Sequence, residues 1–194
     1  MFEWLDKRLL IRESLCKPSL PRGRSSWQYF PGFMTFLLFI AQFITGIWLS
    51  FDFSLMSMPD NTSIIFKFHH VGAHLLLVFM TLQVLRNLFV GAYQQPREFH
   101  WLLLVAIFFL TWFNYYLALL LRPEISEKTY LAIKWLYNFS FMTSYLPNDG
   151  KMTLPQIQNI FILHALVIPL VTYTLFLCYL WLLQRTGLEC RSKD

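Results

Sequence analysis

The chain has few charged residues for its length. Only 14% of its 194 residues are Asp, Glu, Lys or Arg, whereas 56% are hydrophobic and the mean hydropathy is +0.47. Soluble globular domains usually carry about a quarter of charged residues. This composition excludes an ordinary soluble domain and favours a membrane protein.

Cysteine is also scarce. Cys16, Cys178 and Cys190 show no paired spacing, which argues against a disulfide framework and against a zinc site. The first 24 residues are basic and amphipathic rather than continuously apolar, so we predict no cleavable signal peptide. Internal repeats and low-complexity segments are absent, and the organisation must come from the hydrophobic stretches.

Four apolar stretches are long enough to cross a bilayer, which takes roughly 20 residues in a helix. They cover residues 31–51, 69–93, 101–121 and 157–183. Each must be helical, because an unpaired backbone group is too costly in lipid. We therefore predict an all-α fold, an integral membrane four-helix bundle formed by residues 25–190.

Two polar segments flank these stretches. Residues 1–24 are predicted to form an amphipathic tail on the membrane surface, as a topology anchor or a docking element. The segment 124–150 is long for a loop, and its apolar residues recur with helical periodicity, so we expect one or two interfacial helices there. Its apolar set is Tyr130, Leu131, Ile133, Trp135 and Leu136.

The distribution of Lys and Arg predicts the orientation. Basic residues concentrate in both termini and around the loop between the second and third stretches. The positive-inside rule then places both termini and this loop on the cytoplasmic side of a bacterial or organellar membrane. The sequence pI near 9.2 is explained by these membrane-flanking charges, so we predict lipid headgroups and no nucleic acid as partners.

Glycine and proline mark the first and last stretches. Gly32 and Gly46 are 14 residues apart and fall on one helix face. Small residues there allow either another helix or a flat macrocycle to approach the backbone. In the last stretch, Pro155 is expected to begin the helix and Pro169 to kink it.

Two histidines lie inside the apolar stretches at a comparable predicted depth. With the second and fourth helices taken as antiparallel, His69 and His164 both fall on the external side. An intramembrane histidine needs a partner, and haem iron accepts imidazole as an axial ligand. The alternative is that His69, His70 and His74 are interfacial histidines that extend toward the membrane surface or hydrogen-bond the backbone.

The sequence resembles the cytochrome b family, in particular the short four-helix cytochrome b6, over about residues 25–190. The resemblance is in register rather than in overall identity. It is carried by His69–Ala73, Arg86, Gly91, Pro96–Arg97–Glu98, Trp101, Leu163–His164, Pro169, the Arg185–Thr186–Gly187 tail and the paired glycines Gly32 and Gly46.

The resemblance implies two stacked haems, each between a histidine of the second helix and one of the fourth. His69 and His164 match the iron ligands of the external haem. The matching positions for the other haem hold Gln83 and either Cys178 or Tyr179, none of which forms a usual haem b ligand pair. The family's ligands for one haem are therefore retained, and those for the other are missing.

The resemblance also implies residues that surround the haems. The family's two third-helix glycines correspond to Leu104, level with the missing haem, and Ala118, level with the retained one. Gly46 and Ala118 are then expected to line the retained site, and Lys67 to reach a haem propionate or to anchor the helix at the interface.

We therefore expect a membrane haem b subunit of a respiratory or photosynthetic electron-transfer complex, holding one bis-histidine haem. The family's quinol-oxidising Pro-Glu motif is missing, so we expect an electron-transfer subunit rather than an enzyme acting alone. Other subunits, and in some settings quinone or lipid, are the expected partners. Two alternatives stand: a haem-free structural or assembly subunit, and a conventional two-haem subunit with unusual ligands.

Overall fold

The computed structural model describes residues 30–52, 63–94, 97–121 and 154–186. The described residues form four long helical segments. These are α2 (Phe30–Asp52), α3 (Ile64–Phe89), α4 (Glu98–Leu120) and a last segment made of α6 (Leu154–Ile162), the π-helical turn η4 (Leu163–Val167) and α7 (Ile168–Thr186). No strand occurs among them, which confirms the predicted all-α class.

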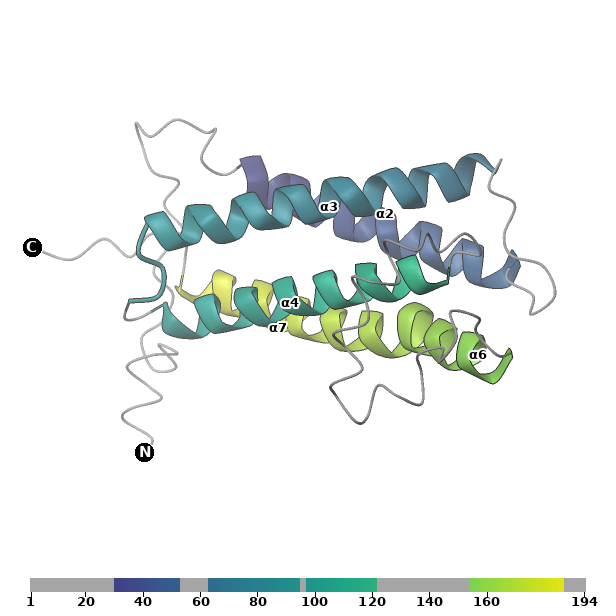
Figure 1. Cartoon of the computed structure of the whole chain (residues 1–194). Helices are drawn as coiled ribbons and strands as arrows, with labels where there is room; N and C mark the ends of the chain where they lie inside the picture. The colour runs from purple at the N-terminus through teal and green to yellow at the C-terminus, as the bar shows by residue number, and fades with distance from the viewer. Residues whose placement is uncertain (1–29, 53–62, 95–96, 122–153, 187–194) are drawn as a thin grey trace, which may run out of the picture.

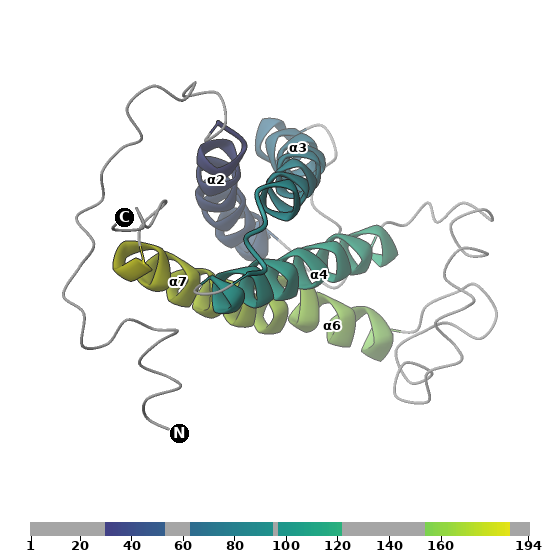
Figure 2. The same ribbon diagram turned by 90° about the vertical axis from the view of Figure 1, so that its left-hand side faces the viewer.

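The helices pack as two pairs. Helix α2 lies along α3, and α4 lies along α7, as Figures 1 and 2 show from two directions. Helices α3 and α4 are also in contact and run antiparallel, as the short connection between them predicts. The space between the two pairs is where a group bound by all four helices would lie.

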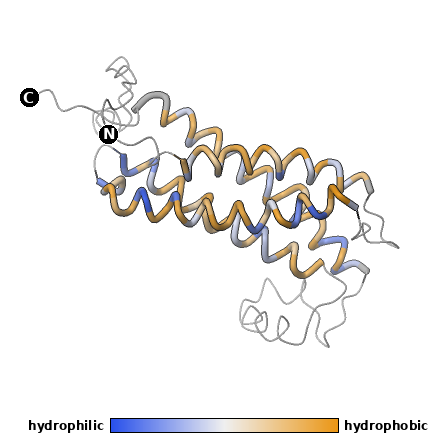
Figure 3. The backbone as a smooth tube through the Cα atoms, turned by 90° about the horizontal axis from the view of Figure 1, so that it is seen from above, coloured by the Kyte–Doolittle hydropathy of each residue, from blue (hydrophilic) through white to orange (hydrophobic). Residues whose placement is uncertain are grey.

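All four segments are long and apolar enough to cross a membrane. Figure 3 shows hydrophobic residues along most of their length. Only 11% to 28% of the side chains in their most apolar windows are buried inside the bundle. Most apolar side chains therefore face outward, which is the arrangement expected where the surrounding solvent is lipid.

Helix α3 begins five residues earlier than the predicted stretch, at Ile64 instead of 69. Ser63 precedes it, and Ile64, Ile65 and Phe66 extend the apolar run into the first turn. His69 therefore lies in the second turn, with its backbone inside regular helix. This correction matters because a regular turn fixes the direction of the His69 side chain.

A glycine ends α3. Gly91 adopts a left-handed φ of 73°, its N–H bonds to the Leu88 carbonyl, and the Ala92 N–H bonds to the Asn87 carbonyl. This pair of bonds is a Schellman motif, which satisfies the last carbonyls of a helix and favours glycine at the left-handed position. It turns the chain back toward α4.

The last segment contains a wide turn in place of a simple kink. Residues Leu163–Val167 form a π-helical turn, in which the Ile168 N–H bonds to the Leu163 carbonyl five residues earlier. Pro169 follows directly and has no N–H to continue an α-helical ladder. The added residue relieves the clash that the proline ring would make with the preceding turn.

The direction of the last segment corrects one expectation. Helices α3 and α6–α7 run in the same direction, not antiparallel (Figure 1). His69 and His164 nevertheless come to a common depth, because both helices begin at the same end of the bundle and both residues lie near that beginning. The predicted tail 1–24 and the interfacial helices within 124–150 lie outside the described residues.

Candidate functional site

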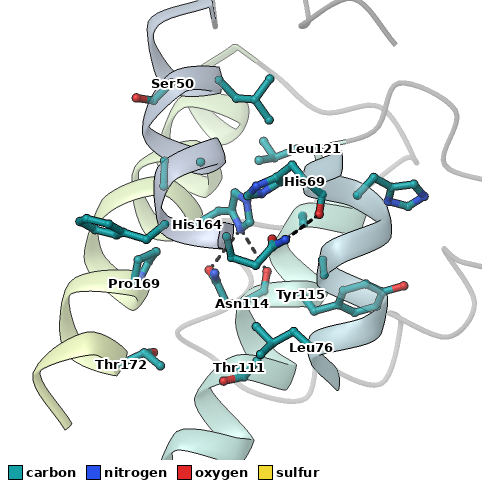
Figure 4. Close-up of a pocket in the computed structure, with 18 of the residues that line it drawn as sticks. Ser50, His69, Leu76, Thr111, Asn114, Tyr115, Leu121, His164, Pro169 and Thr172 are labelled. Atoms are coloured by element: carbon teal, nitrogen blue, oxygen red, sulfur yellow. Dashed lines mark hydrogen bonds between the residues drawn. The ribbon is translucent and has the colours of Figure 1, made fainter. Parts of the chain in front are cut away.

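A cavity of about 240 Å³ lies between the two helix pairs. Every one of the four helical segments contributes residues to its wall. Its lining is mostly apolar, and Phe39 and Leu76, which line it, also belong to the buried cluster packed beneath it. His69 and His164 lie together in this cavity (Figure 4).

The His69 ring is held by a hydroxyl of α2. Its Nδ1 lies 2.8 Å from Thr45 Oγ1, and that hydroxyl lies 2.7 Å from the carbonyl oxygen of Ala41. A carbonyl can only accept, so the Thr45 O–H donates to Ala41 and its oxygen accepts from His69 Nδ1–H. The His69 proton is thereby assigned to Nδ1, and Nε2 keeps its lone pair.

Two further α2 residues fix the position of His69. The Gln42 side-chain Nε2 donates to the His69 carbonyl oxygen at 3.1 Å, which ties α2 to the backbone of α3. Gly46 lies beneath the ring: a Cβ placed there would be 3.3 Å from His69 Cε1. A side chain at this position would press on the imidazole edge, so the close approach of His69 to α2 favours glycine.

The His164 ring is held by α4. Its Nδ1 lies 3.1 Å from the Asn114 carbonyl oxygen and 3.1 Å from the Asn114 side-chain Oδ1. Two acceptors at one nitrogen assign the proton to Nδ1 here as well. The ring projects from the π-helical turn, a type of turn that occurs frequently at functional sites.

The two rings therefore present the same chemistry to the cavity. None of the described residues hydrogen-bonds to Nε2 of either ring. The ring centroids are 6.4 Å apart with their planes at 83°. Imidazole nitrogen is a common ligand of iron, copper and zinc. Two rings this close, each with a free Nε2, are a donor set that would suit a metal held by both imidazoles.

Of the other predicted site residues, two line the cavity and one does not. Gly46 and Ala118 line the cavity. Lys67 is exposed near the start of α3 and does not line it. Its assignment to a haem propionate stays a prediction.

The remaining histidines of α3 form a separate network. His74 Nδ1 bonds to the His70 carbonyl oxygen at 2.8 Å, and its Nε2 bonds to the Tyr115 hydroxyl at 2.9 Å. Both nitrogens of His74 are thus satisfied within the protein. His74 is exposed on the outer side of α3, and the network joins α3 to α4.

At the level predicted for a second haem, polar side chains replace ligands. Gln83 is buried with 7% exposure, and its amide lies against Gly32, where an added Cβ would be 3.1 Å from Oε1 and Nε2. Cys178 is exposed, so of the two candidate partners on α7 it is Tyr179 that faces inward and contacts Gln83.

Side chains fill the volume around this polar pair. Leu104 is buried at 4% exposure and packs in one cluster with Met80, Ile107 and Phe176, and Tyr179 packs against the same cluster. His100 is buried at 7% exposure, 5.9 Å from the Tyr179 ring, and bonds to the backbone of Leu182. Neither Gln83 nor Tyr179 is an imidazole, and buried side chains pack beside them.

A family model described as cytochrome b (N-terminal)/b6/petB matches residues 74–194. This chain belongs to the cytochrome b family. The match includes His164 and begins five residues after His69, but longer alignments cover both. Cytochrome b6 of Heliobacterium mobile is 24% identical and aligns with 96% of this chain and 98% of its own length.

Longer cytochrome b relatives match only in part. The menaquinol:cytochrome c reductase cytochrome b subunit of Bacillus subtilis is 28% identical over 56% of this chain and 58% of its own length. A chain from a solved structure titled "Hyperthermophilic respiratory Complex III" matches all of this chain and 59% of itself, with a TM-score of 0.72 and 17% identity. That likeness confirms the fold. The chain is a multi-pass membrane protein with the cytochrome b architecture.

Sequence reasoning missed the residues that orient the His69 and His164 rings. Gln42, Thr45 and Asn114 were passed over, as was the buried His100. A signal was present, because a polar side chain inside an apolar span must find an internal partner. The sequence alone does not say which partner each one finds.

Proposed function

We propose that this cytochrome b is an electron-transfer subunit of a respiratory or photosynthetic complex, and that it holds one haem b between His69 and His164. The observation that carries the proposal is the pair of rings in one cavity, each with Nδ1 bonded to the protein and with no hydrogen bond from the described residues to Nε2. Cytochrome b6 and cytochrome b relatives support the choice of haem b.

The chain's own residues prepare the site. Haem b bound there supplies a one-electron iron couple. Thr45 and Asn114 hold the two rings in the tautomer that leaves Nε2 free to bind iron. Gly46 and Ala118 have small side chains or none, which leaves space in the cavity. Phe39 and Leu76 close its lower end with apolar side chains that exclude water.

The second position argues for a single haem. Gln83 and Tyr179, which contact each other, stand at the positions of the expected ligands, and Leu104 belongs to the buried cluster against which Tyr179 packs. Binding a macrocycle there would require this cluster to open, and buried apolar contacts of that size cost several kcal/mol to lose, about 2–5 kcal/mol per large side chain. No electron-transfer step is assigned to this half of the bundle.

We further propose that the haem lies on the external side of the membrane and that both termini are cytoplasmic. The distribution of Lys and Arg supports this orientation. With one haem near one face, the subunit exchanges electrons at that face and depends on neighbouring subunits for the rest of the electron path.

A haem count tests the proposal. Purified in mild detergent, the full chain should give one haem b per chain by pyridine haemochrome assay and a low-spin bis-histidine spectrum. Two haems per chain would support the conventional two-haem subunit and overturn the single-haem proposal. A chain without haem, yet folded and helical by circular dichroism, would instead support a structural or assembly role.

A further inference from the structure

The two ligand rings are held by different numbers of acceptors. We propose that Thr45 and Asn114 are positioning residues that act unequally: Thr45 is needed for tight haem retention, whereas Asn114 mainly adjusts the midpoint potential. The inference rests on the proposed haem site between His69 and His164. It adds two residues, on α2 and α4, that neither the sequence motifs nor the comparisons single out.

Thr45 is the single acceptor for the His69 ring. Its oxygen lies 2.8 Å from His69 Nδ1, while its proton is committed to the Ala41 carbonyl at 2.7 Å, with the Gln42 carbonyl at 3.4 Å. The geometry forms a chain from the ring N–H through the hydroxyl to the backbone of α2. Among the described residues, the His69 ring has no second acceptor to replace the hydroxyl.

Asn114 offers His164 two acceptors, one on its side chain and one on its backbone. The side-chain Oδ1 and the backbone carbonyl are each 3.1 Å from His164 Nδ1 (Figure 4). Substitution of Asn114 removes the side-chain oxygen and leaves the backbone carbonyl. The tautomer of His164 therefore survives loss of the Asn114 amide, although the ring then has one acceptor fewer.

The consequences for a bound metal differ accordingly. Without the Thr45 hydroxyl, a ring N–H is left unsatisfied in an apolar setting, and the ring gains by rotating away from its ligating position. Without the Asn114 amide, His164 keeps its position but donates less electron density, because an acceptor at the distal nitrogen raises the basicity of a ligating imidazole. Weaker donation favours reduced iron and raises the midpoint potential.

The experiment compares four variants of the full chain purified in detergent. Thr45→Val removes the hydroxyl at nearly constant volume, and Thr45→Ser restores it. Asn114→Leu removes the amide. Thr81→Val is the matched control, because Thr81 also donates to the carbonyl four residues earlier, Leu77, at 2.7 Å, but lies away from the cavity. Haem occupancy, haem transfer to apomyoglobin and the redox midpoint are measured.

We expect Thr45→Val to retain haem roughly 10–100-fold more weakly, the range typical of lost partners to a ligating histidine. Thr45→Ser should return to within a few-fold of wild type, and Thr81→Val should match wild type. Asn114→Leu should keep its haem and its low-spin spectrum, with a midpoint shifted to higher potential.

Two results overturn the inference and are distinguishable. If wild type binds haem while Thr45→Val matches Thr81→Val in occupancy and midpoint, Thr45 does not position His69. If Asn114→Leu loses haem as completely as Thr45→Val, the two residues contribute equally and the proposed difference between them is wrong. A wild-type chain without haem rejects the proposed function itself, and this inference with it. Helical circular dichroism and size-exclusion profiles identify a misfolded variant. If Thr45→Val misfolds, the haem retention of Thr45→Ser is compared with that of wild type instead.

Discussion

The five histidines of the chain acquire different roles through their hydrogen bonds. His69 and His164 each have one ring nitrogen that no described residue hydrogen-bonds, whereas His74 uses both of its nitrogens on the His70 carbonyl and the Tyr115 hydroxyl. A histidine with no nitrogen to spare serves as a brace between helices. A histidine with an oriented free nitrogen is prepared to bind a metal.

Alanine substitutions test this division at the residue scale. His69→Ala and His164→Ala should each abolish the low-spin haem spectrum, because a single imidazole cannot supply two axial bonds. His74→Ala should leave the spectrum intact, and His70→Ala should do so largely, since the proposed iron bonds involve neither ring. The reduced-minus-oxidised difference spectrum of each detergent-purified variant provides the measurement.

A His164→Ala protein that keeps a bis-imidazole spectrum would falsify the ligand assignment. Loss of haem in His74→Ala alone would instead place the ligands in the α3–α4 network. Because His74 is exposed, its substitution should alter helix packing little.

At the scale of elements, α2 contributes twice through glycine. Gly46 lies under the His69 ring, and Gly32 lies under the Gln83 amide. The two glycines have the same spacing that a pair of macrocycles would need, yet the structure shows different neighbours for them. One supports a ligand ring at the cavity, and the other supports a buried amide in a packed polar layer.

Matched glycine substitutions test this asymmetry. Gly46→Val should remove most of the haem signal, because a Cβ there would already be 3.3 Å from His69 Cε1 and the added methyl groups must displace the ring. Gly32→Val should press on Gln83 and lower stability by about 1–3 kcal/mol, the usual cost of overpacking, with haem content unchanged. Haem per protein and the thermal midpoint are measured side by side; equal haem loss in both would contradict the single-site proposal.

The π-helical turn in the last helical segment sets the direction of the His164 side chain. The π-helical turn Leu163–Val167 carries His164, and Pro169 follows it. An added residue in a helix rotates everything after it relative to everything before it. The segment can therefore aim His164 at the cavity while α7 beyond it packs Phe176 and Tyr179 against the lower cluster.

At the scale of the whole molecule, the apolar surface is larger than the apolar core. At most 28% of any apolar window is buried within the chain, and exposed aromatic residues occur on α2, α3, α4 and α7. Lipid covers such a surface in a membrane, and neighbouring subunits cover part of it in a complex. A bundle with one haem also needs redox partners, since it has no second centre of its own under the proposed function.

Co-purification tests the dependence on partners. Extracted from its native membrane in a mild detergent, the protein should elute in a complex that mass spectrometry resolves into this chain and at least one further redox subunit. The physical reason is that one haem accepts and passes on single electrons without completing a two-electron reaction. A monodisperse single chain that oxidises quinol unaided would contradict the prediction.

Composition and hydrophobic spacing were enough to predict the all-α class and the four membrane segments of this protein. Low charge and four apolar stretches of about 20 residues leave helices as the only structure that satisfies the backbone in lipid. The positions of His69 and His164 in their apolar stretches left a haem site and an interfacial role both open, and the resemblance to the cytochrome b family favoured the haem site. The interfacial segment 124–150, the tail 1–24 and the role of Lys67 stay predictions.

The contacts between side chains of different helices became known only from the tertiary structure. Thr45 meets His69 across 24 residues of sequence, and Asn114 meets His164 across 50. Periodicity could not choose between Cys178 and Tyr179, and the π-helical turn was not foreseeable from Pro169 alone. Spacing along one helix fixes depth and face, but the hydrogen bonds that assign a proton to one ring nitrogen depend on how separate helices pack.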